Sequence, residues 1–390
     1  MKVLCVLMTA QFLIVASDLP PAFGGGISRY YHEICRALPS QMIVVAIFCN
    51  NDQFDKIQPF KIFRLRTPLS HTFVARLIQT FLFGTYSTLI AYSEKANLIL
   101  FGHWYLTVMG PVIQMLTGLP FGVFLHGGEL DRFGVGTLIR RVVMSSFEHA
   151  CVIIVNSEYT LQEYRQLGGK NPHVLKLTPG VDTRRFIPSA DCRNVLDRYA
   201  LNGKRVLLSV SRLVERKGHD VVLKALPIIV EQIPQVIYVI VGFGPQEAHL
   251  RSLVAELGIA DRVIFVGYVS EEDLPTYYNA CDVFVMPSRQ IDGREGIEGF
   301  GIVYLEANAC GKPVIGGNSG GVAEAVQDGV TGLLVDPLDH YAVANAVIKL
   351  LCDPDLARRL GAQGRERAER EFAWSKQAIR LRNALEEALQ

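Results

Sequence analysis

Two glutamates, Glu298 and Glu306, bracket a glycine-bearing turn and the first part of an apolar run. The run predicts a helix over residues 302–310, with Gly311 as its stop signal. Unpaired amides at the start of such a helix bind anions, and glycines beside them let a phosphate approach the backbone closely. The expected phosphate contacts are Gly299, Phe300, Gly301 and Ile302.

Glu306 lies about 6 Å along the axis of this helix, and helical side chains lean back toward the N-terminus. A carboxylate there would repel phosphate, but it can accept hydrogen bonds from the two hydroxyls of a ribose. Glu298, ahead of the turn, would reach the hydroxyls of a second sugar. Amides for phosphate and two carboxylates for two sugars describe a nucleotide-sugar site. The alternative is that Glu298 is a solvated loop residue and Glu306 a charge on the helix surface.

A basic segment, SRLVERKGHD at residues 211–220, follows a predicted strand. Arg212 offers a rigid fork for phosphate oxygens and Lys217 a mobile point charge, which are the groups that stabilise a leaving diphosphate. A solvated basic turn is the alternative. Gly242 and Val269 lie at the ends of two further predicted strands, where Gly242 permits close approach to the donor and the backbone of Val269 could contact its base.

In the first half of the chain, three consecutive glycines precede a predicted helix, and the last two of them are Gly25 and Gly26. They are expected to form a second anion-binding turn. Arg29 occupies the third glycine position of the dinucleotide fingerprint, which disfavours a dehydrogenase. His126 ends another predicted strand, and two glycines and Glu129 follow it. We expect His126 at a ligand cleft, with a buried core histidine as the alternative.

Short apolar runs alternate with helical patterns, which is typical of parallel sheets covered by helices. The alternation weakens over residues 181–194. We therefore expect an α/β protein with two doubly wound domains, 1–186 and 187–373, facing each other across a cleft, and a last helix, 374–390, that packs back on the first domain. The predicted strands are 12–17, 42–48, 97–102, 121–127, 151–157, 173–180, 205–213, 235–244, 262–269, 283–288, 313–317 and 332–337.

The composition excludes a disordered chain, since 49% of the 390 residues are hydrophobic and 20% are charged. Basic residues exceed acidic ones over residues 1–186, although the whole chain has a net charge of only +1. This asymmetry suggests an anionic partner such as lipid head groups. The apolar residues 1–16 fit a buried first strand better than a signal peptide, and whether residues 1–11 belong to that strand stays open.

The cysteines and acidic residues argue against a metal site. Eight cysteines lie far apart without a CxxC motif, which favours reduced thiols in the cytosol. A single DxD motif joins Asp353 and Asp355, and a proline between them marks it as a helix cap. We therefore expect no metal and no other cofactor.

These motifs together resemble glycosyltransferase family 4, and the resemblance covers nearly the whole chain. Glu298 and Glu306 fit its E-x7-E signature, Arg212 and Lys217 its basic motif, and His126 its HGGE element. The resemblance implies a GT-B fold and a retaining, metal-independent transfer from a nucleoside-diphosphate sugar. The sequence of residues 298–315 is most similar to that of bacterial phosphatidylinositol mannoside mannosyltransferases, which use GDP-mannose.

Carried onto this sequence, the family roles put Gly25 and Gly26 against the diphosphate from the first domain. Glu306 would hold the ribose, Glu298 the transferred sugar, and His126 would line the reaction centre. The expected donor is GDP-mannose or a UDP-sugar, the acceptor a lipid-linked molecule or a glycan, and no nucleic acid is involved. The expected location is the cytoplasm, including its membrane face.

The acceptor side rests on residues 61–92, which mix basic residues with apolar ones such as Leu77 and Phe81. This segment is either a surface for a membrane acceptor or a helix of the domain core. Two other functions stay open: a non-transferring GT-B enzyme such as a nucleotide-sugar epimerase, and a non-catalytic nucleotide-binding scaffold. The sequence does not identify the nucleobase, the sugar, the acceptor, the linkage or the oligomeric state.

Overall fold

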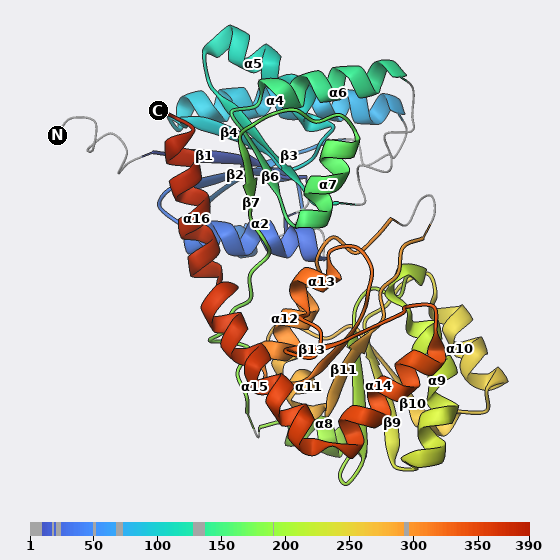
Figure 1. Ribbon diagram of the computed structural model, residues 1–390. Coiled ribbons are helices and arrows are strands. Elements are labelled where there is room, and N and C mark those ends of the chain that lie inside the picture. The colour runs from blue at the N-terminus through green and yellow to red at the C-terminus, as the bar shows by residue number, and fades with distance from the viewer. Residues whose placement is uncertain are drawn as a thin grey trace. The chain divides into compact units, whose positions relative to one another are not determined.

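A computed structural model describes residues 10–17, 19–20, 25–49, 52–67, 73–127, 137–189, 191–291 and 296–390. The chain divides into two compact units (Figure 1). The first comprises Met1–Pro179 together with Trp374–Gln390, and the second comprises Gly180–Ala373. The division follows Pro179, whereas the sequence analysis placed it after residue 186.

The N-terminal unit is built on a seven-stranded parallel sheet with the order β3-β2-β1-β4-β5-β6-β7. The bounds are β1 Phe12–Val15, α2 Gly26–Ala37, β2 Met42–Ile47, α3 Asp52–Lys56, β3 Lys61–Leu65, α4 Phe73–Ser93, β4 Leu98–Phe101, η1 Leu106–Met109, α5 Gly110–Thr117, β5 Phe121–Leu125, α6 Thr137–His149, β6 Val152–Val155, α7 Glu158–Gln166, β7 Val174–Lys176 and α16 Trp374–Glu387.

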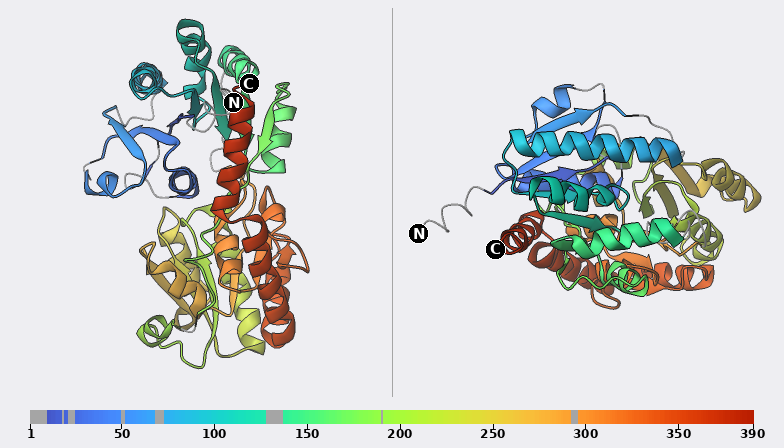
Figure 2. Two further views of the ribbon diagram at one scale, coloured as in Figure 1. Left: turned by 90° about the vertical axis from the view of Figure 1, so that its left-hand side faces the viewer. Right: turned by 90° about the horizontal axis from the view of Figure 1, so that it is seen from above.

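Side chains of successive strand residues enter two different apolar layers, as the two-residue period of a strand requires. Phe12 and Ile14 face the layer that contains α2 and α16, while Leu13 and Val15 face the layer that contains α4 to α7. Burial on both faces explains why these strands read as continuous apolar runs. Helix α16 lies against the N-terminal unit, and buries Trp374 there (Figures 1 and 2).

One strand was missed by the sequence analysis. β3 is Lys61–Leu65, at the edge of the sheet, and pairs with β2 from Ile43↔Lys61 to Ile47↔Leu65. Its residues are exposed or half-buried, so it lacks the apolar run by which the inner strands were recognised. The start of the segment 61–92 is therefore a strand of the sheet.

Residues 1–9 lie outside the described part of the chain, so whether they belong to the first strand stays open.

The C-terminal unit has a six-stranded parallel sheet with the order β10-β9-β8-β11-β12-β13. The bounds are α8 Arg193–Arg198, β8 Arg205–Val210, η3 Glu215–Lys217, α9 His219–Gln232, β9 Val236–Val241, α10 Glu247–Glu256, η4 Ala260–Arg262, β10 Val263–Gly267, α11 Leu274–Ala280, β11 Val283–Met286, α12 Ile302–Ala309, β12 Val314–Gly317, α13 Val322–Ala325, β13 Gly332–Val335, α14 His340–Cys352 and α15 Pro354–Glu371.

Helices cover both faces of this sheet. One apolar layer takes in α8, α11, α12 and α13, and the other takes in α9, α10 and α14. The strands and the helix α12 predicted for this half are confirmed, and the helix begins at Ile302 as expected. Asp353 caps α15 by accepting a hydrogen bond from the Leu356 amide at 2.9 Å, so the DxD motif is a helix cap.

Candidate active site

Residues 211–218 of the predicted basic segment leave the carboxyl end of β8 in the middle of the sheet and lead into α9, which begins at His219. We keep the name basic segment for residues 211–218. Gly218 closes it with φ +72, and a Cβ at this position would lie 2.2 Å from the Pro287 carbonyl. Glycine is therefore required here, because a side chain would be strained and would clash with the loop after β11. The Arg289 amide also donates to the Arg216 carbonyl at 2.8 Å. These contacts fix the segment against the neighbouring strand end.

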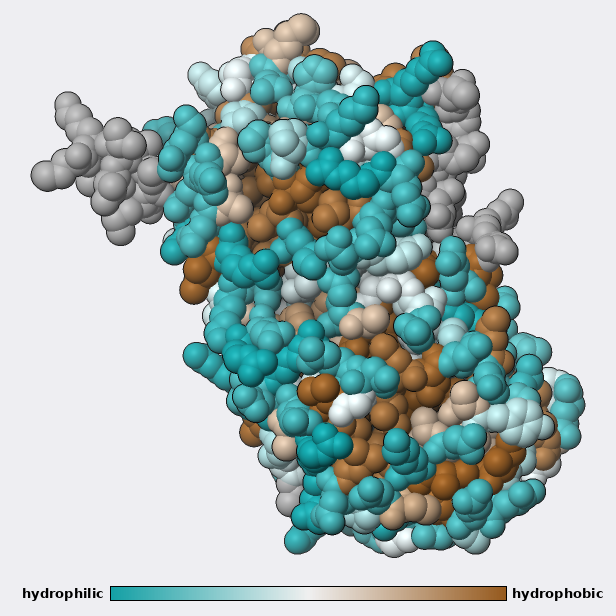
Figure 3. Space-filling model, viewed as in Figure 1, coloured by the Kyte–Doolittle hydropathy of each residue, from teal (hydrophilic) through white to brown (hydrophobic). Residues whose placement is uncertain are grey.

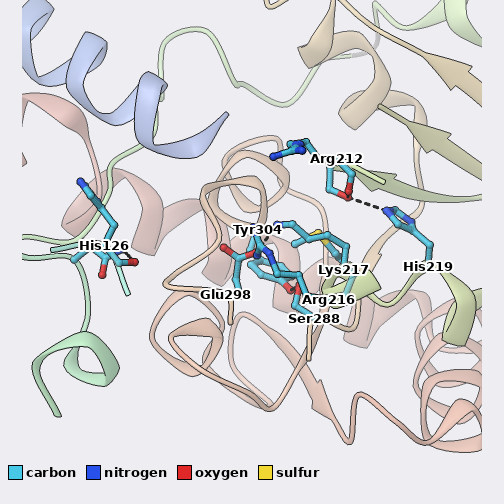
Figure 4. Close-up of polar contacts among 11 residues, drawn as sticks. His126, Arg212, Arg216, Lys217, His219, Ser288, Glu298 and Tyr304 are labelled. Atoms are coloured by element: carbon cyan, nitrogen blue, oxygen red, sulfur yellow. Dashed lines mark hydrogen bonds and ion pairs between the residues drawn. The ribbon is translucent and has the colours of Figure 1, made fainter. Parts of the chain in front are cut away.

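Glu298 is the centre of a buried ion cluster (Figure 4). Its Oε2 accepts a hydrogen bond from Arg216 Nη1 at 3.1 Å and forms a close ion pair with Lys217. The side chains of Lys217 and Glu298 are only 11% and 12% exposed. The alternatives of a solvated basic turn and a solvated loop residue are therefore wrong for Lys217 and Glu298. Arg212 is exposed at the surface of the segment.

The loop of Glu298 is held by backbone contacts with a second glycine turn. The Gly321 amide donates to the Glu298 carbonyl at 2.9 Å, and a Cβ on Gly321 would lie 2.0 Å from the Gly299 carbonyl. Beneath the turn, the Tyr304 hydroxyl donates to the Met286 carbonyl at 2.5 Å. A Cβ on Gly301, which has φ +94, would meet the Tyr304 ring at 2.5 Å. Because Gly301 and Gly321 lack side chains, the backbone of the turn can lie directly against the Tyr304 ring and the second glycine turn.

The ion cluster controls the protonation of Glu298. Burial by itself would raise the pKa of its carboxyl, but Lys217 and Arg216 outweigh burial and lower it to about 2. Burial lowers the pKa of Lys217, while Glu298 acts in the opposite direction. The carboxylate is ionised at neutral pH, and it neutralises cations that would otherwise attract a phosphate.

We expect the unfolding free energy to fall as the pH decreases from about 5 to about 2, in part through Glu298. Its pKa in the folded protein is about 2, below the ordinary value of 4.5, so its stabilisation is complete above pH 5 and is lost on acidification. The contribution is of the order of 3 kcal/mol. Urea unfolding at pH 6 and pH 3 should show a smaller loss for Glu298→Gln than for the unmodified protein. Equal losses would contradict this assignment.

Glu306 is buried inside the unit, with 1% exposure. Its Oε2 accepts a hydrogen bond from the Tyr278 hydroxyl of α11 at 2.7 Å. Buried carboxylates are held by hydrogen bonds of this kind, so the alternative of a helix-surface charge is wrong. The ribose role of Glu306 stays a prediction, as do the phosphate contacts of Phe300 and Ile302.

The turns after β9 and β10 adjoin each other, because the Gly242 amide donates to the Gly267 carbonyl at 2.8 Å. Gly242 has φ +127, and a Cβ there would lie 1.9 Å from the Ser211 carbonyl. The close approach that the glycine allows is thus made by the basic segment itself. Val269 follows the exposed Tyr268, and its contact with a nucleobase stays a prediction.

In the N-terminal unit, His126 is 6% exposed and lies against the rings of Tyr30, Tyr31 and Phe124. The Tyr31 hydroxyl lies 2.5 Å from both the Gly102 carbonyl and His126 Nε2. Since a carbonyl only accepts, Tyr31 donates to Gly102, and His126 Nε2 must carry the proton that Tyr31 accepts. The alternative of a buried histidine is thus supported, and a role at the reaction centre stays a prediction.

The glycine turn before α2 is only partly described. Gly25 has φ +140 and caps the helix, which begins at Gly26. A Cβ on Gly25 would meet nothing within 4 Å, so packing does not explain this glycine. Gly24 and Glu129 lie outside the described residues. Their roles, and the diphosphate contact of Gly25 and Gly26, stay predictions.

Within the described ranges, no group of three His, Cys, Asp or Glu residues could hold a metal ion. In the same part of the chain, no helix is long and apolar enough to span a membrane.

Two family descriptions match the chain: Glycosyltransferase Family 4 over residues 24–185 and Glycosyl transferases group 1 over residues 197–367. The chain is similar to the GDP-mannose-dependent alpha-(1-6)-phosphatidylinositol monomannoside mannosyltransferase of Mycobacterium tuberculosis, with 33% identity over 96% of this chain and 98% of the relative. The protein of the same name from Mycolicibacterium smegmatis is 37% identical over 72% of this chain and 73% of the relative.

The chain belongs to glycosyltransferase family 4. The structure of Anabaena HepE in complex with UDP-glucose has the same fold, with a TM-score of 0.81, 22% identity and coverage of 97% of this chain and 99% of that one. The glycosyltransferase therefore has the GT-B fold, with two Rossmann-like units.

Arg216 is one of three residues at the two glutamate positions that the sequence analysis missed. It lies directly beside Lys217, yet only the fold shows that its guanidinium shares the Glu298 carboxylate. The position of Arg216 next to Lys217 in the sequence was a signal that could have identified it. Gly321 and Tyr278 were missed as well, because their contacts with the two glutamate positions span loops that the motif does not contain.

Proposed function

We propose that the enzyme is a retaining, metal-independent hexosyltransferase that moves mannose from GDP-mannose to a phosphatidylinositol-based acceptor. The observation that carries the proposal is the buried contact of Lys217 and Arg216 with Glu298. The names of the two mannosyltransferases support the donor and the acceptor class. A sugar from a UDP-sugar, another lipid-linked acceptor and a glycan acceptor are the alternatives within this proposal.

The ion cluster supports a mechanism in which the diphosphate of the donor replaces the Glu298 carboxylate as the partner of the two cations. A diphosphate at the basic segment would compete with Glu298 for Lys217 and Arg216, both of which lie at its carboxylate. The released carboxylate would then accept hydrogen bonds from hydroxyls of the transferred sugar. The two cations, with Arg212, would stabilise the negative charge that develops on the leaving diphosphate. Fixed cations can supply this charge without a bound metal.

We expect slow hydrolysis of GDP-mannose by the purified enzyme, at least about tenfold faster than hydrolysis of UDP- and ADP-sugars, because a site built for one base leaves its groups unpaired with another. A donor panel without acceptor measures this directly, and the same panel with excess EDTA tests metal independence. An α-anomeric product from the α-linked donor, observed by NMR, would support retention.

The same panel separates the other functions. Conversion of the donor to an epimer would favour the non-transferring alternative, and binding without any turnover would favour the scaffold. Faster turnover of a UDP-sugar than of GDP-mannose would contradict the proposed donor.

Helix α4 supports a membrane-bound acceptor, because its outward side is more apolar than the side that packs on the rest of the unit. The residues that face the rest of the unit are mostly small or polar, whereas the outward stripe is apolar. An ordinary surface helix has the opposite arrangement. The inward residues are Ala75, Gln79, Thr80, Phe83, Gly84, Ser87 and Ala91, and the outward apolar ones are Val74, Leu77, Ile78, Phe81, Leu89 and Tyr92.

The apolar stripe continues onto the neighbouring helices, since α5 contacts both α4 and α6. In Figure 3, apolar residues reach the surface at the upper edge of the N-terminal unit, where α5 lies. The exposed large apolar residues on α5 and α6 are Val112, Met115, Leu116, Leu138 and Val142. We call this surface of α4, α5 and α6 the apolar face. Arg140 and Arg141 are exposed on α6, as an anionic bilayer would require.

We propose that the apolar face lies on the cytoplasmic side of a membrane and holds the enzyme near its lipid acceptor. Cys35, Cys281 and Cys310 are buried free thiols, which supports a reducing compartment.

We expect the enzyme to bind anionic phospholipid vesicles, and Leu77→Ser combined with Phe81→Ser to weaken binding at least about fivefold, through loss of buried apolar area. Pelleting with vesicles at low and high salt measures this. The control is Leu338→Ser with Tyr341→Ser, which changes two side chains of similar exposure in the C-terminal unit (70% and 61%, against 53% and 59%). No binding at low salt would contradict the membrane proposal.

A further inference from the structure

A chain of hydrogen-bonding side chains crosses the apolar layer beneath α9 and ends at the basic segment. Tyr238 and His219 are 0% and 2% exposed. The Tyr238 hydroxyl lies 2.7 Å from Ser209 Oγ and 3.0 Å from His219 Nδ1. His219 Nε2 lies 2.8 Å from Ser211 Oγ, and Ser209 Oγ forms a short hydrogen bond with the Val285 carbonyl. The labelled His219 points toward the start of the basic segment in Figure 4.

The Val285 carbonyl fixes the direction of the hydrogen bonds that run from Ser209 through Tyr238 to His219 Nδ1. A carbonyl only accepts, so Ser209 donates its one proton to it. Tyr238 must then donate to Ser209, and the Tyr238 oxygen accepts from His219 Nδ1–H. With the ring neutral, His219 Nε2 is left as an acceptor, so Ser211 donates its one proton to it rather than to the Arg212 carbonyl, which lies 3.0 Å from its Oγ. A single neutral tautomer of His219 satisfies the whole chain.

The surroundings of His219 keep the ring neutral. Burial is the main cause that lowers its pKa to about 3, and the nearby charge of Lys217 adds to this. Asp220 acts in the opposite direction, but Arg289 from the loop after β11 forms an ion pair with it at 2.8 Å. A second proton on the ring would also remove the acceptor that Ser211 uses.

Ser211 is the residue at which this chain of hydrogen bonds reaches the basic segment. Its hydroxyl also lies 3.0 Å from the Arg212 carbonyl, which is the competing acceptor. Without His219 Nε2, the hydroxyl would turn to that carbonyl, which is already bonded by the Val214 amide at 2.9 Å. The backbone that carries Arg212 would then lose its side-chain tie to the core of the unit.

We propose that His219 is a positioning residue for donor binding, whose Nδ1–H tautomer fixes Ser211 and thereby the segment that carries the phosphate-binding cations. The role in binding rests on the proposed function. The tautomer itself does not, and the two parts can be tested separately.

The tautomer is tested by NMR of the full chain labelled with ¹⁵N-histidine. We expect His219, assigned with the variant His219→Gln, to show the Nδ1–H pattern and to keep it from pH 5 to pH 8. In Tyr238→Phe, which removes the acceptor of Nδ1–H, this pattern should be lost. An Nε2–H pattern, or titration of His219 within this pH range, would overturn the proposal.

The positioning role is tested by calorimetric binding of GDP. We expect Tyr238→Phe to weaken the affinity about tenfold at a temperature where it is folded, because the cations lose their fixed geometry. The matched control is Tyr277→Phe, whose hydroxyl lies 3.3 Å from the Tyr199 hydroxyl in the same unit. Tyr238→Phe affinity within twofold of the unmodified protein, even with a lowered Tm, would overturn the positioning role. An unmodified protein that binds none of GDP, UDP and ADP would instead contradict the proposed function, and with it the role in binding.

Discussion

Glu298→Gln is expected to reduce sugar transfer about 10²- to 10³-fold while GDP binds about three- to tenfold more tightly. Without donor, the Glu298 carboxylate is paired with Lys217 and Arg216. In the proposed mechanism, a diphosphate displaces this carboxylate and then remains beside its negative charge. Glutamine removes that competition, but it also removes the charge of the group proposed to accept hydrogen bonds from the transferred sugar. The two effects have opposite signs, which few other roles of a glutamate would produce.

Calorimetry with GDP and turnover with the donor measure the two effects of Glu298→Gln. The matched control is Glu247→Gln, which makes the same change in an exposed ion pair with Arg251 on α10. The control should change neither quantity, because surface ion pairs contribute little. Weaker GDP binding together with intact transfer would show that Glu298 does not take the role proposed for it.

Lys217→Ala is expected to lower kcat/KM about 10³-fold, which corresponds to about 4 kcal/mol of transition-state stabilisation. The side chain is buried, so water and salt screen its charge less than they screen that of an exposed lysine. Of the two cations that the structure describes at Glu298, Arg216 would remain, and the pKa of the Glu298 carboxyl would rise because its main counter-charge is lost. GDP affinity should fall as well, in contrast to the effect of Glu298→Gln.

The experiment compares Lys217→Ala with Lys217→Arg and Lys224→Ala. Arginine keeps the charge and should restore part of the activity, although its geometry differs from that of lysine. Lys224 is half-exposed on α9, with Asp220 3.9 Å away, so its removal should leave kcat/KM unchanged. Melting curves of all variants would exclude unfolding as the cause. Full turnover by Lys217→Ala would refute the phosphate role.

The sequence predicted the element that carries Glu306 because its signals are local. Glycines, an apolar run and a stop signal lie within one short stretch, and α12 begins at Ile302 as they indicate. The inner strands were found for the same reason, since burial on both faces leaves a continuous apolar run. The edge strand β3 has no such run, and it was missed.

The alternatives that the sequence left open concern burial and pairing, which local patterns do not encode. Lys217 and Glu298 are 81 positions apart, and only the packing of the β8 and β11 loops brings them into contact. The outward orientation of Leu77 and Phe81 likewise depends on which side of α4 packs on the sheet. Both outcomes follow from tertiary contacts between distant segments.

The sequence by itself determined that the chain forms parallel sheets covered by helices, and where helix α12 begins. Periodicity and turn residues act within a few positions, so they can be read along the chain. Only the tertiary structure decided that Arg216 joins Lys217 at Glu298, and that one tautomer of His219 ties the basic segment to the core. These features depend on distances between side chains from different strands, and folding alone sets those distances.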